Sequence, residues 1–445
     1  MQNKNYESGF ERIYGYEDVK KVLYNILDCM DDANRYKKLG AKMPHGLLLT
    51  GIPGVGKTIL SKAFIKMSNR HAYMVDSACG SNRICDQIKA AFVAARTNQP
   101  SIILLDDFDK YQSRYDDNGA FRTLQSCIDK VSDDDVFVVG TINEIRRIPA
   151  SLTRDGRFDY IINIEGPNQK VREQFVSKNM KSHPFEKSII PEDIASLLSG
   201  KTCAEIDSFF NQSAMNAAYR NSDMISIEDI IKSYAKIQVI NNNEDGEDTE
   251  DLDYDASDNP NMVGQRLNGK DVDRLEEVAY HEVGHLLVSE ACNIGSIGFV
   301  SILNYKDLDS YCLINKQATK RSHLIITLLG GKASVEMQFG ILASGCSSDI
   351  QSAEKLIREG LTRNANRGYK LTTLDDNSKV PEEVSAATTV EFARYDYVAK
   401  EIMSLNREFI NHAVILLKKK KYLLLSDIKQ LEKDYPINNQ SIINL

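Results

Sequence analysis

The sequence has no run of apolar residues approaching the ~18–20 that a membrane-spanning helix requires. Its start, Met-Gln-Asn-Lys-Asn-Tyr-Glu, lacks the apolar stretch of a signal peptide. The eight cysteines include no C-x-x-C pair, which is typical of reduced thiols and not of a disulfide framework. A net charge of −8 argues against a nucleic-acid or anionic-membrane partner. These absences predict a soluble, cytoplasmic protein, and 445 residues leave room for several domains.

The first half of the chain alternates short apolar runs with longer segments of helical period. This alternation predicts a mostly parallel α/β sheet with helices on both faces. The segment from Lys170 to about Ile240 lacks strand signals and predicts a small helical domain. The expected strands are Gly46–Thr50, Ala72–Asp76, Ile102–Asp106, Val136–Thr141 and Tyr160–Ile164, with helices between them such as Thr58–Met67 and Arg83–Arg96.

An acidic segment separates this half from the rest of the chain. Residues 244–258 hold nine acidic residues and no Lys or Arg, so the segment repels itself and favours a solvated linker over a dedicated binding tail. From Asp271 helical periodicity dominates to the C-terminus, apart from a short β piece near Phe299–Leu303. We expect Tyr422–Leu431 to pack as helix.

A phosphate-binding loop follows the first predicted strand. The segment from Gly51 to Thr58 reads G-I-P-G-V-G-K-T and opens a predicted helix. In such a loop backbone N–H groups cradle the phosphates of ATP, the lysine reaches the β- and γ-phosphates, and the hydroxyl sits on Mg²⁺. The candidate nucleotide-binding residues are Gly51, Pro53, Gly54, Val55, Gly56, Lys57 and Thr58.

Further polar residues follow later strands. Asp106 and Asp107 end the run Ile-Ile-Leu-Leu-Asp-Asp, where the first acid holds the metal through water and the second orients the attacking water. Asn143 helps to place the same water. Arg154 and Arg157 have no evident local partner, and in a ring they would reach a neighbouring subunit's γ-phosphate as arginine fingers; two arginines in a loop are more often simply solvated.

A metal-binding motif stands in the second half. Residues 281–285 read His-Glu-Val-Gly-His, which on a helix places His281 and His285 on one face for a zinc ion, with Glu282 as general base. A third protein ligand is required. Asp349 is the best candidate, although it equally suits a first-turn helix acid; Glu336 and His323 are the alternatives. Cys346 is interpreted as a lone buried thiol.

With these motifs in this order, the chain resembles the FtsH-type AAA+ zinc metalloproteases from about Gly15 to the C-terminus. Further matching segments are Lys38-Leu-Gly-Ala-Lys-Met-Pro-His-Gly and Leu329-Gly-Gly-Lys-Ala-Ser-Val-Glu336. The resemblance implies that Asp349, in a Ser-Asp-Ile context before a helix, is the third zinc ligand. It implies that Gly15 and Tyr16 lie near the adenine, and that arginine fingers act in trans in a hexameric ring that threads protein substrates. The implied domains are an extension (1–12), an AAA+ α/β domain (13–167), its small helical domain (168–240), an acidic linker (241–265) and a mostly α-helical zinc metallopeptidase domain (266–445).

The chain departs from this family in three respects. Family members carry N-terminal membrane helices, whereas here about a dozen residues precede the ATPase domain, so we expect no membrane insertion by this chain. Asp107 stands where the family has Glu, which predicts slow hydrolysis. The segment Ser77-Ala-Cys-Gly-Ser-Asn-Arg-Ile lacks the aromatic residue that grips substrate in the pore.

Two functions therefore remain open. The first is an ATP-dependent zinc endopeptidase acting on unfolded or flexible proteins. The second is an ATP-binding, chaperone-like or assembly subunit with a weak or partner-dependent motor, which cuts only unfolded substrates or none. A mixed ring, in which a paralogue supplies the motor, reconciles the two and is an alternative to a homo-hexamer.

Overall fold

The computed structural model describes residues 7–10, 13–75, 81–111, 119–244, 274–292, 297–302, 311–314, 320–340, 344–363 and 382–440. The chain divides into two compact units. One comprises residues 1–182 and 200–211, and the other residues 183–199 and 212–445. Most of the acidic segment and residues 77–80 of the polar pore segment lie outside the described residues.

The first unit is built on a five-stranded parallel sheet in the order β2-β3-β4-β1-β5. The five predicted strands are confirmed within one residue at each end, and the predicted α/β class is confirmed with them. The strands are β1 (Gly46–Thr50), β2 (His71–Val75), β3 (Ser101–Leu105), β4 (Val136–Ile142) and β5 (Tyr160–Asn163).

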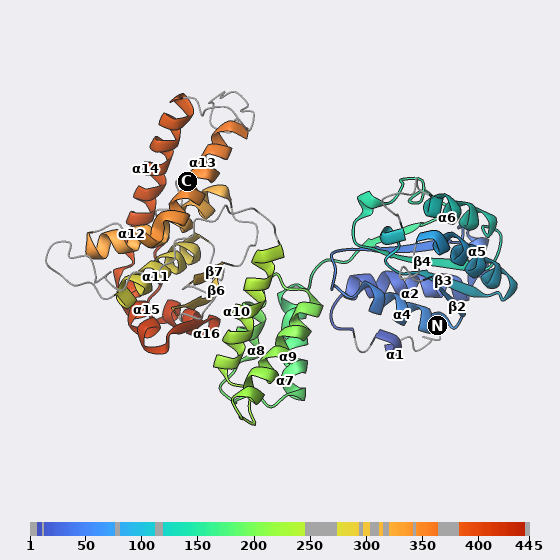
Figure 1. Ribbon diagram of the computed structural model, residues 1–445, viewed down its shortest axis with the longest axis horizontal. Helices are drawn as coiled ribbons and strands as arrows, with labels where there is room; N and C mark the ends of the chain where they lie inside the picture. Colours follow the sequence, from blue (N-terminus) through green and yellow to red (C-terminus); the bar gives the residue numbers. More distant parts are fainter. Residues whose placement is uncertain are drawn as a thin grey trace. The chain divides into compact units, whose positions relative to one another are not determined.

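Successive side chains of the central strands enter two separate cores, because side chains alternate between the faces of a strand. In β3, Ile102 and Leu104 join the core on one face, and Ile103 and Leu105 join the core on the other. The first core lies against α2 and α4 and the second against α5 and α6 (Figure 1). Apolar residues therefore occupy consecutive positions, as in a parallel sheet covered on both faces. The helices of this unit are α1 (Glu7–Phe10), α2 (Glu17–Asp31), α3 (Ala33–Lys38), α4 (Lys57–Ser68), α5 (Ser81–Thr97), α6 (Gly119–Lys130), α7 (Gln169–Ser182) and the first half of α9 (Cys203–Tyr219), with short 3-10 turns η1 (Phe108–Tyr111) and η2 (Ile145–Arg147).

The second unit is mostly helical, as predicted. Its helices beyond the second half of α9 are α8 (Pro191–Leu197), α10 (Ile227–Glu244), α11 (Arg274–Cys292), α12 (Arg321–Phe339), α13 (Ser347–Arg363), α14 (Glu382–Leu405), α15 (Arg407–Lys420) and α16 (Leu425–Asp434), with the 3-10 turn η3 (Ser344–Cys346) before α13. None of the helices in the described ranges combines the length and apolarity needed to cross a membrane.

A small antiparallel sheet joins three distant segments of this unit, in the order β7-β6-β8. Its central strand β6 (Ile297–Ser301) matches the predicted β piece, and β7 (Tyr311–Ile314) pairs along one edge. The expectation of helix throughout Tyr422–Leu431 is wrong. Tyr422–Leu424 forms β8 and pairs with β6, and only from Leu425 does the chain become helical.

Helices α11 and α12 cross at two glycines. A Cβ atom on Gly284 would lie 2.3 Å from the carbonyl oxygen of Gly330, and one on Gly330 would lie 2.6 Å from the carbonyl oxygen of Gly284. Any larger residue would separate the backbones, so these two glycines permit the close approach of the helices. The crossing places the His-Glu-Val-Gly-His turn directly against α12.

Candidate nucleotide and metal sites

The phosphate loop lies between β1 and α4. Gly54 and Gly56 have φ values of 83° and 96°, a backbone region that strongly favours glycine. The Nζ of Lys57 donates hydrogen bonds to the carbonyl oxygens of Gly51 (2.6 Å) and Ile52 (3.0 Å) and to Oδ1 of Asn143 (2.9 Å). Burial lowers the pKa of Lys57, partly opposed by the negative charge of Asp107. The loop thus holds its own lysine, and Asn143 lies beside it.

Asp106 faces Thr58 across the end of the sheet. Its Oδ1 accepts hydrogen bonds from Oγ1 of Thr58 (3.0 Å) and from Oγ1 of Thr141 (2.6 Å). Hydroxyl and carboxylate oxygens in this arrangement are suited to a magnesium ion and its waters. Thr141, which the sequence argument did not single out, is the last residue but one of β4 and also accepts a hydrogen bond from the backbone N–H of Asp107 (2.8 Å).

Asp107 is held by an ion pair that the sequence argument overlooked. Its backbone has a φ of 49°, and its Oδ2 lies 2.6 Å from Nζ of Lys110. The hydrogen bond to Asp107 raises the pKa of Lys110. A third acid, Asp109, is buried, and its Oδ2 accepts a hydrogen bond from the backbone N–H of Asn143 (3.1 Å). The i, i+3 spacing of Asp107 and Lys110 in the sequence could have indicated this ion pair.

Tyr16 lies beside the phosphate loop, and Gly15 precedes it in the chain. Both have left-handed backbone angles, with φ values of 68° and 57°. The Tyr16 hydroxyl lies 3.3 Å from the carbonyl oxygen of Val55 and 3.2 Å from that of Glu165, which follows β5. Burial raises the pKa of Tyr16. The Tyr16 hydroxyl therefore contacts the phosphate loop, and an adenine contact of Gly15 and Tyr16 stays a prediction.

The two arginines differ from each other in their surroundings. The expectation that both lack a local partner is wrong for Arg157, whose guanidinium forms two 2.9 Å hydrogen bonds to the carboxylate of Asp129 on α6 and a 2.6 Å bond to the carbonyl oxygen of Ser151. Arg154 is exposed, and its side chain makes no ion pair or hydrogen bond with the described part of the chain. Arginine–carboxylate pairs are frequently two-point contacts of this kind, which fix the geometry of the guanidinium.

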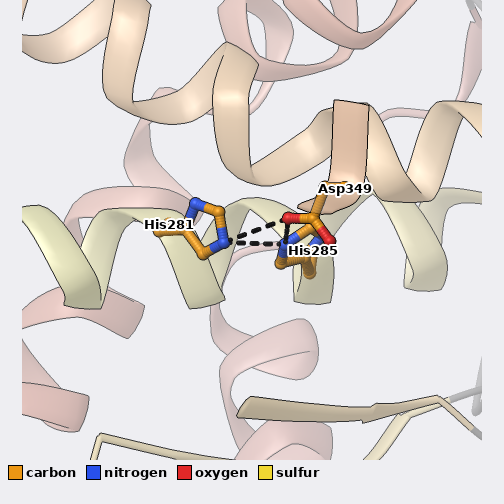
Figure 2. A group of neighbouring side chains, drawn as sticks. All are labelled: His281, His285 and Asp349. Atoms are coloured by element: carbon orange, nitrogen blue, oxygen red, sulfur yellow. Dashed lines mark hydrogen bonds and ion pairs between the residues drawn. The ribbon is translucent and has the colours of Figure 1, made fainter. Parts of the chain in front are cut away.

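The metal site brings together His281, His285 and Asp349 (Figure 2). The two histidines lie one turn apart on α11, and Asp349 lies in the first turn of α13. The Nε2 atoms of the histidines are 3.1 Å apart, and Oδ2 of Asp349 lies 3.3 Å from Nε2 of His281 and 3.2 Å from Nε2 of His285. These three are the one group of potential metal ligands among the described residues.

The spacing of these atoms fits zinc. Ligand atoms about 2.0–2.1 Å from a tetrahedral zinc ion are separated by about 3.3 Å, and the three observed separations are 3.1–3.3 Å. Burial alone would raise the pKa of Asp349, but the two imidazoles outweigh it and lower the pKa well below its usual range. An ionised carboxylate and two imidazoles form a ligand set that zinc accepts.

The alternative ligands lie elsewhere. Glu336 is held by two lysines, with Oε2 at 2.8 Å from Nζ of Lys332 and Oε1 at 3.0 Å from Nζ of Lys400. His323, on the first turn of α12, is outside the ligand group, and burial lowers its pKa. Neither replaces Asp349 in the structure.

The groups behind the ligands were not predicted. The carbonyl oxygen of Thr327 accepts a hydrogen bond from Nδ1 of His285 (2.8 Å), which leaves the Nε2 lone pair of that ring facing the site. Cys346 is buried and lies outside the ligand group, as expected, but its Sγ lies 3.5 Å from Nδ1 of His281, a contact that was not predicted. Both contacts depend on tertiary packing and have no local signal in the sequence.

Glu282 is next to His281 on α11 and is buried. Its negative charge contributes to the raised pKa of His285, against the opposing effect of burial, which is the largest single influence. A carboxylate close to the ligands is suited to accept a proton from a water molecule that attacks a carbonyl.

Comparison with known proteins agrees with both halves. Residues 47–166 match the family of ATPases associated with various cellular activities (AAA). A protein named ATP-dependent zinc metalloprotease FtsH 2 from Thermoanaerobacter is 28% identical over 84% of this chain and 74% of its own length. The ATP-dependent zinc metalloprotease YME1L1 of Mus musculus is 24% identical over 92% of this chain, and an FtsH of Leuconostoc mesenteroides is 26% identical over 93%.

The fold and the site therefore define an AAA-type ATPase unit continued by a helical unit with a His-His-Asp ligand set. More narrowly, the chain is similar over most of its length to FtsH-type AAA+ zinc metalloproteases, at 24–28% identity. It spans just over half the length of the mouse and Leuconostoc relatives, at 56% and 59%.

Proposed function

We propose that the chain is an ATP-dependent zinc endopeptidase. The observation that carries the proposal is the convergence of His281, His285 and Asp349, whose ligand atoms lie 3.1–3.3 Å apart beside the buried Glu282. The names of the FtsH-type relatives, which describe ATP-dependent zinc metalloproteases, support it. The cofactors proposed for this chain are Zn²⁺, ATP and Mg²⁺.

In this mechanism the zinc ion, when bound, supplies a Lewis acid that polarises the scissile carbonyl and acidifies a water molecule. The Nε2 atoms of His281 and His285 and the carboxylate of Asp349 would hold the zinc ion. Glu282 takes the proton from the attacking water and returns it to the leaving amine. The carbonyl of Thr327 holds His285 in the tautomer whose Nε2 is available.

At the nucleotide site Lys57 and the loop N–H groups bind the phosphates, and Thr58 and Asp106 hold Mg²⁺. Asn143 and Asp107 position the attacking water. Arg154, exposed and without a partner in the described residues, would act in trans on a neighbouring subunit in a hexameric or mixed ring. Arg157 must leave Asp129 before it does the same.

A second candidate function is supported by one specific observation. The ion pair of Asp107 with Lys110 neutralises the carboxylate that should orient the attacking water. A motor limited in this way suits a chaperone-like or assembly subunit that binds ATP and turns it over slowly, or a ring in which a paralogue supplies the power.

Degradation of an unfolded protein distinguishes the two. Casein is incubated with the zinc-loaded chain, with ATP, without nucleotide, and with the Lys57→Ala variant in ATP. The endopeptidase proposal expects cleavage that requires ATP and is lost in Lys57→Ala. ATP binding without any ATP-stimulated cleavage would contradict it and favour the second candidate.

A further inference from the structure

The two histidines of the metal site must meet the same requirement. Each must offer Nε2 as a lone pair, because the Nε2 atoms face each other and Asp349. In a neutral imidazole the proton then sits on Nδ1, and this N–H needs an acceptor that fixes the ring. For His285 the acceptor is the backbone carbonyl of Thr327.

For His281 the described structure provides a sulfur atom in the equivalent place. Sγ of Cys346 lies 3.5 Å from Nδ1 of His281, a hydrogen-bonding distance for sulfur. The thiol is 1% exposed, so water does not compete for this contact. The sulfur is on the Nδ1 side of the ring, away from the atom that faces Asp349, and it is therefore placed to orient the ligand and not to be one.

The local chain geometry couples this contact to the third ligand. Cys346 ends the 3-10 turn η3, and Asp349 follows three residues later in the first turn of α13. Gly331 of α12 also lies against this edge of the ring, since a Cβ atom there would lie 2.6 Å from Nδ1 and Cε1 of His281. The Nδ1 edge of the imidazole thus faces both a glycine that leaves it room and a sulfur that can accept its hydrogen bond.

We propose that Cys346 is a positioning residue of the metal centre, which accepts the Nδ1–H of His281 and so keeps Nε2 of that ring directed at the zinc ion. This proposal rests on the proposed zinc site. Partners of this kind typically contribute tenfold to a hundredfold to metal affinity.

The test is zinc affinity, measured by competition with a chromophoric chelator, for Cys346→Ala and Cys346→Ser. Both replacements are smaller than cysteine, but only serine keeps an acceptor. We expect affinity to fall about tenfold or more in the alanine variant and about threefold or less in the serine variant. Equal losses in the two would show that packing alone matters and would overturn the proposal, as would no loss in either.

Two controls separate the possible failures. Cys292→Ala removes the thiol at the end of α11, the helix that carries both histidines. The zinc affinity of this variant should equal that of the unmodified chain. Cobalt substitution should give no thiolate-to-cobalt charge-transfer band; such a band, lost in Cys346→Ala, would make Cys346 a ligand and overturn the positioning role. If the unmodified chain binds no zinc, the proposed function itself fails; if it binds zinc and Cys346→Ala binds equally well, only this inference fails.

Discussion

Gly331 lies against His285 so closely that a Cβ atom on the glycine would be 2.6 Å from the Nε2 ligand atom. The same atom would be 2.6 Å from Nδ1 of His281. A contact under 3.0 Å forces one of the two atoms to shift, so a residue larger than Gly331 would displace both rings from the backbone of α12, which forms the floor of the metal site.

We therefore predict that Gly331→Ala lowers zinc affinity by about tenfold or more, because both rings must turn away from their ligand positions. The measurement is equilibrium zinc binding. Gly345→Ala is the matched control. Gly345 lies four residues before the ligand Asp349, but a Cβ atom there would meet open space. Normal zinc affinity in Gly331→Ala would show that the rings do not need this floor.

A closed set of four charges joins α12 to α14. Lys332 and Lys400 each contact both Glu336 and Asp396, with separations of 2.6–3.0 Å. Burial opposes ionisation of Asp396, but the two lysines outweigh it and lower its pKa. Because its pKa is lower in the folded chain than in the unfolded chain, its contribution to stability is present above about pH 4–5 and is lost as the pH falls.

We predict that Asp396→Asn lowers the free energy of unfolding by about 2 kcal/mol at neutral pH, and that the difference from the unmodified chain narrows toward pH 3. Urea unfolding across this pH range measures both. Glu192→Gln, which breaks the exposed pair with Lys429, is the control and should change stability by less than about 1 kcal/mol. A difference independent of pH would exclude the ion pairs as its cause.

We predict that the Lys110–Asp107 ion pair slows ATP hydrolysis. The ammonium 2.6 Å from Oδ2 reduces the ability of the carboxylate to orient and polarise water. Lys110→Ala should raise the ATPase kcat several-fold with little change in KM, and Lys110→Arg should leave it near the original value. Asp107→Asn should remove activity with or without Lys110; an unchanged or lower kcat in Lys110→Ala contradicts this effect of the ion pair.

Replacing Arg154 and replacing Arg157 should have different effects on ATP hydrolysis and on stability. Arg154→Ala should abolish ring-dependent ATP hydrolysis without affecting thermal unfolding, because its side chain is exposed. Arg157→Ala should lower stability by about 1 kcal/mol, since it breaks the two-point contact with Asp129. Asp129→Asn is the matched variant: if it lowers stability as Arg157→Ala does while hydrolysis persists, the role of Arg157 is structural.

Local patterns of apolar residues in the sequence were sufficient to predict much of the fold. The runs Gly46–Thr50 and Ile102–Leu105 are buried on both faces, which is why an unbroken apolar run followed by a turn identified them as strands. Tyr422–Leu424 was mistaken for helix because a three-residue apolar segment has no readable period, and its pairing with β6 is a contact across more than 100 residues.

The candidate site shows the same limit. His281 and His285 follow from helical spacing alone, whereas the Asp349 carboxylate reaches them through the packing of a separate helix and was reached from family resemblance. The contacts of Thr327 and Cys346 with the two rings depend on how three helical segments pack together, so no sequence pattern predicts them. Lys110 was within reach, because residues three apart in one turn are neighbours.

The most direct test of the account is peptide-bond cleavage by Glu282→Gln, with zinc content measured on the same samples. Glutamine keeps the size and burial of the side chain but does not accept the proton of the attacking water. The account predicts bound zinc equal to that of the unmodified chain and cleavage of casein in ATP reduced by at least about a hundredfold. Cleavage at an undiminished rate with zinc retained would contradict the proposed zinc endopeptidase mechanism.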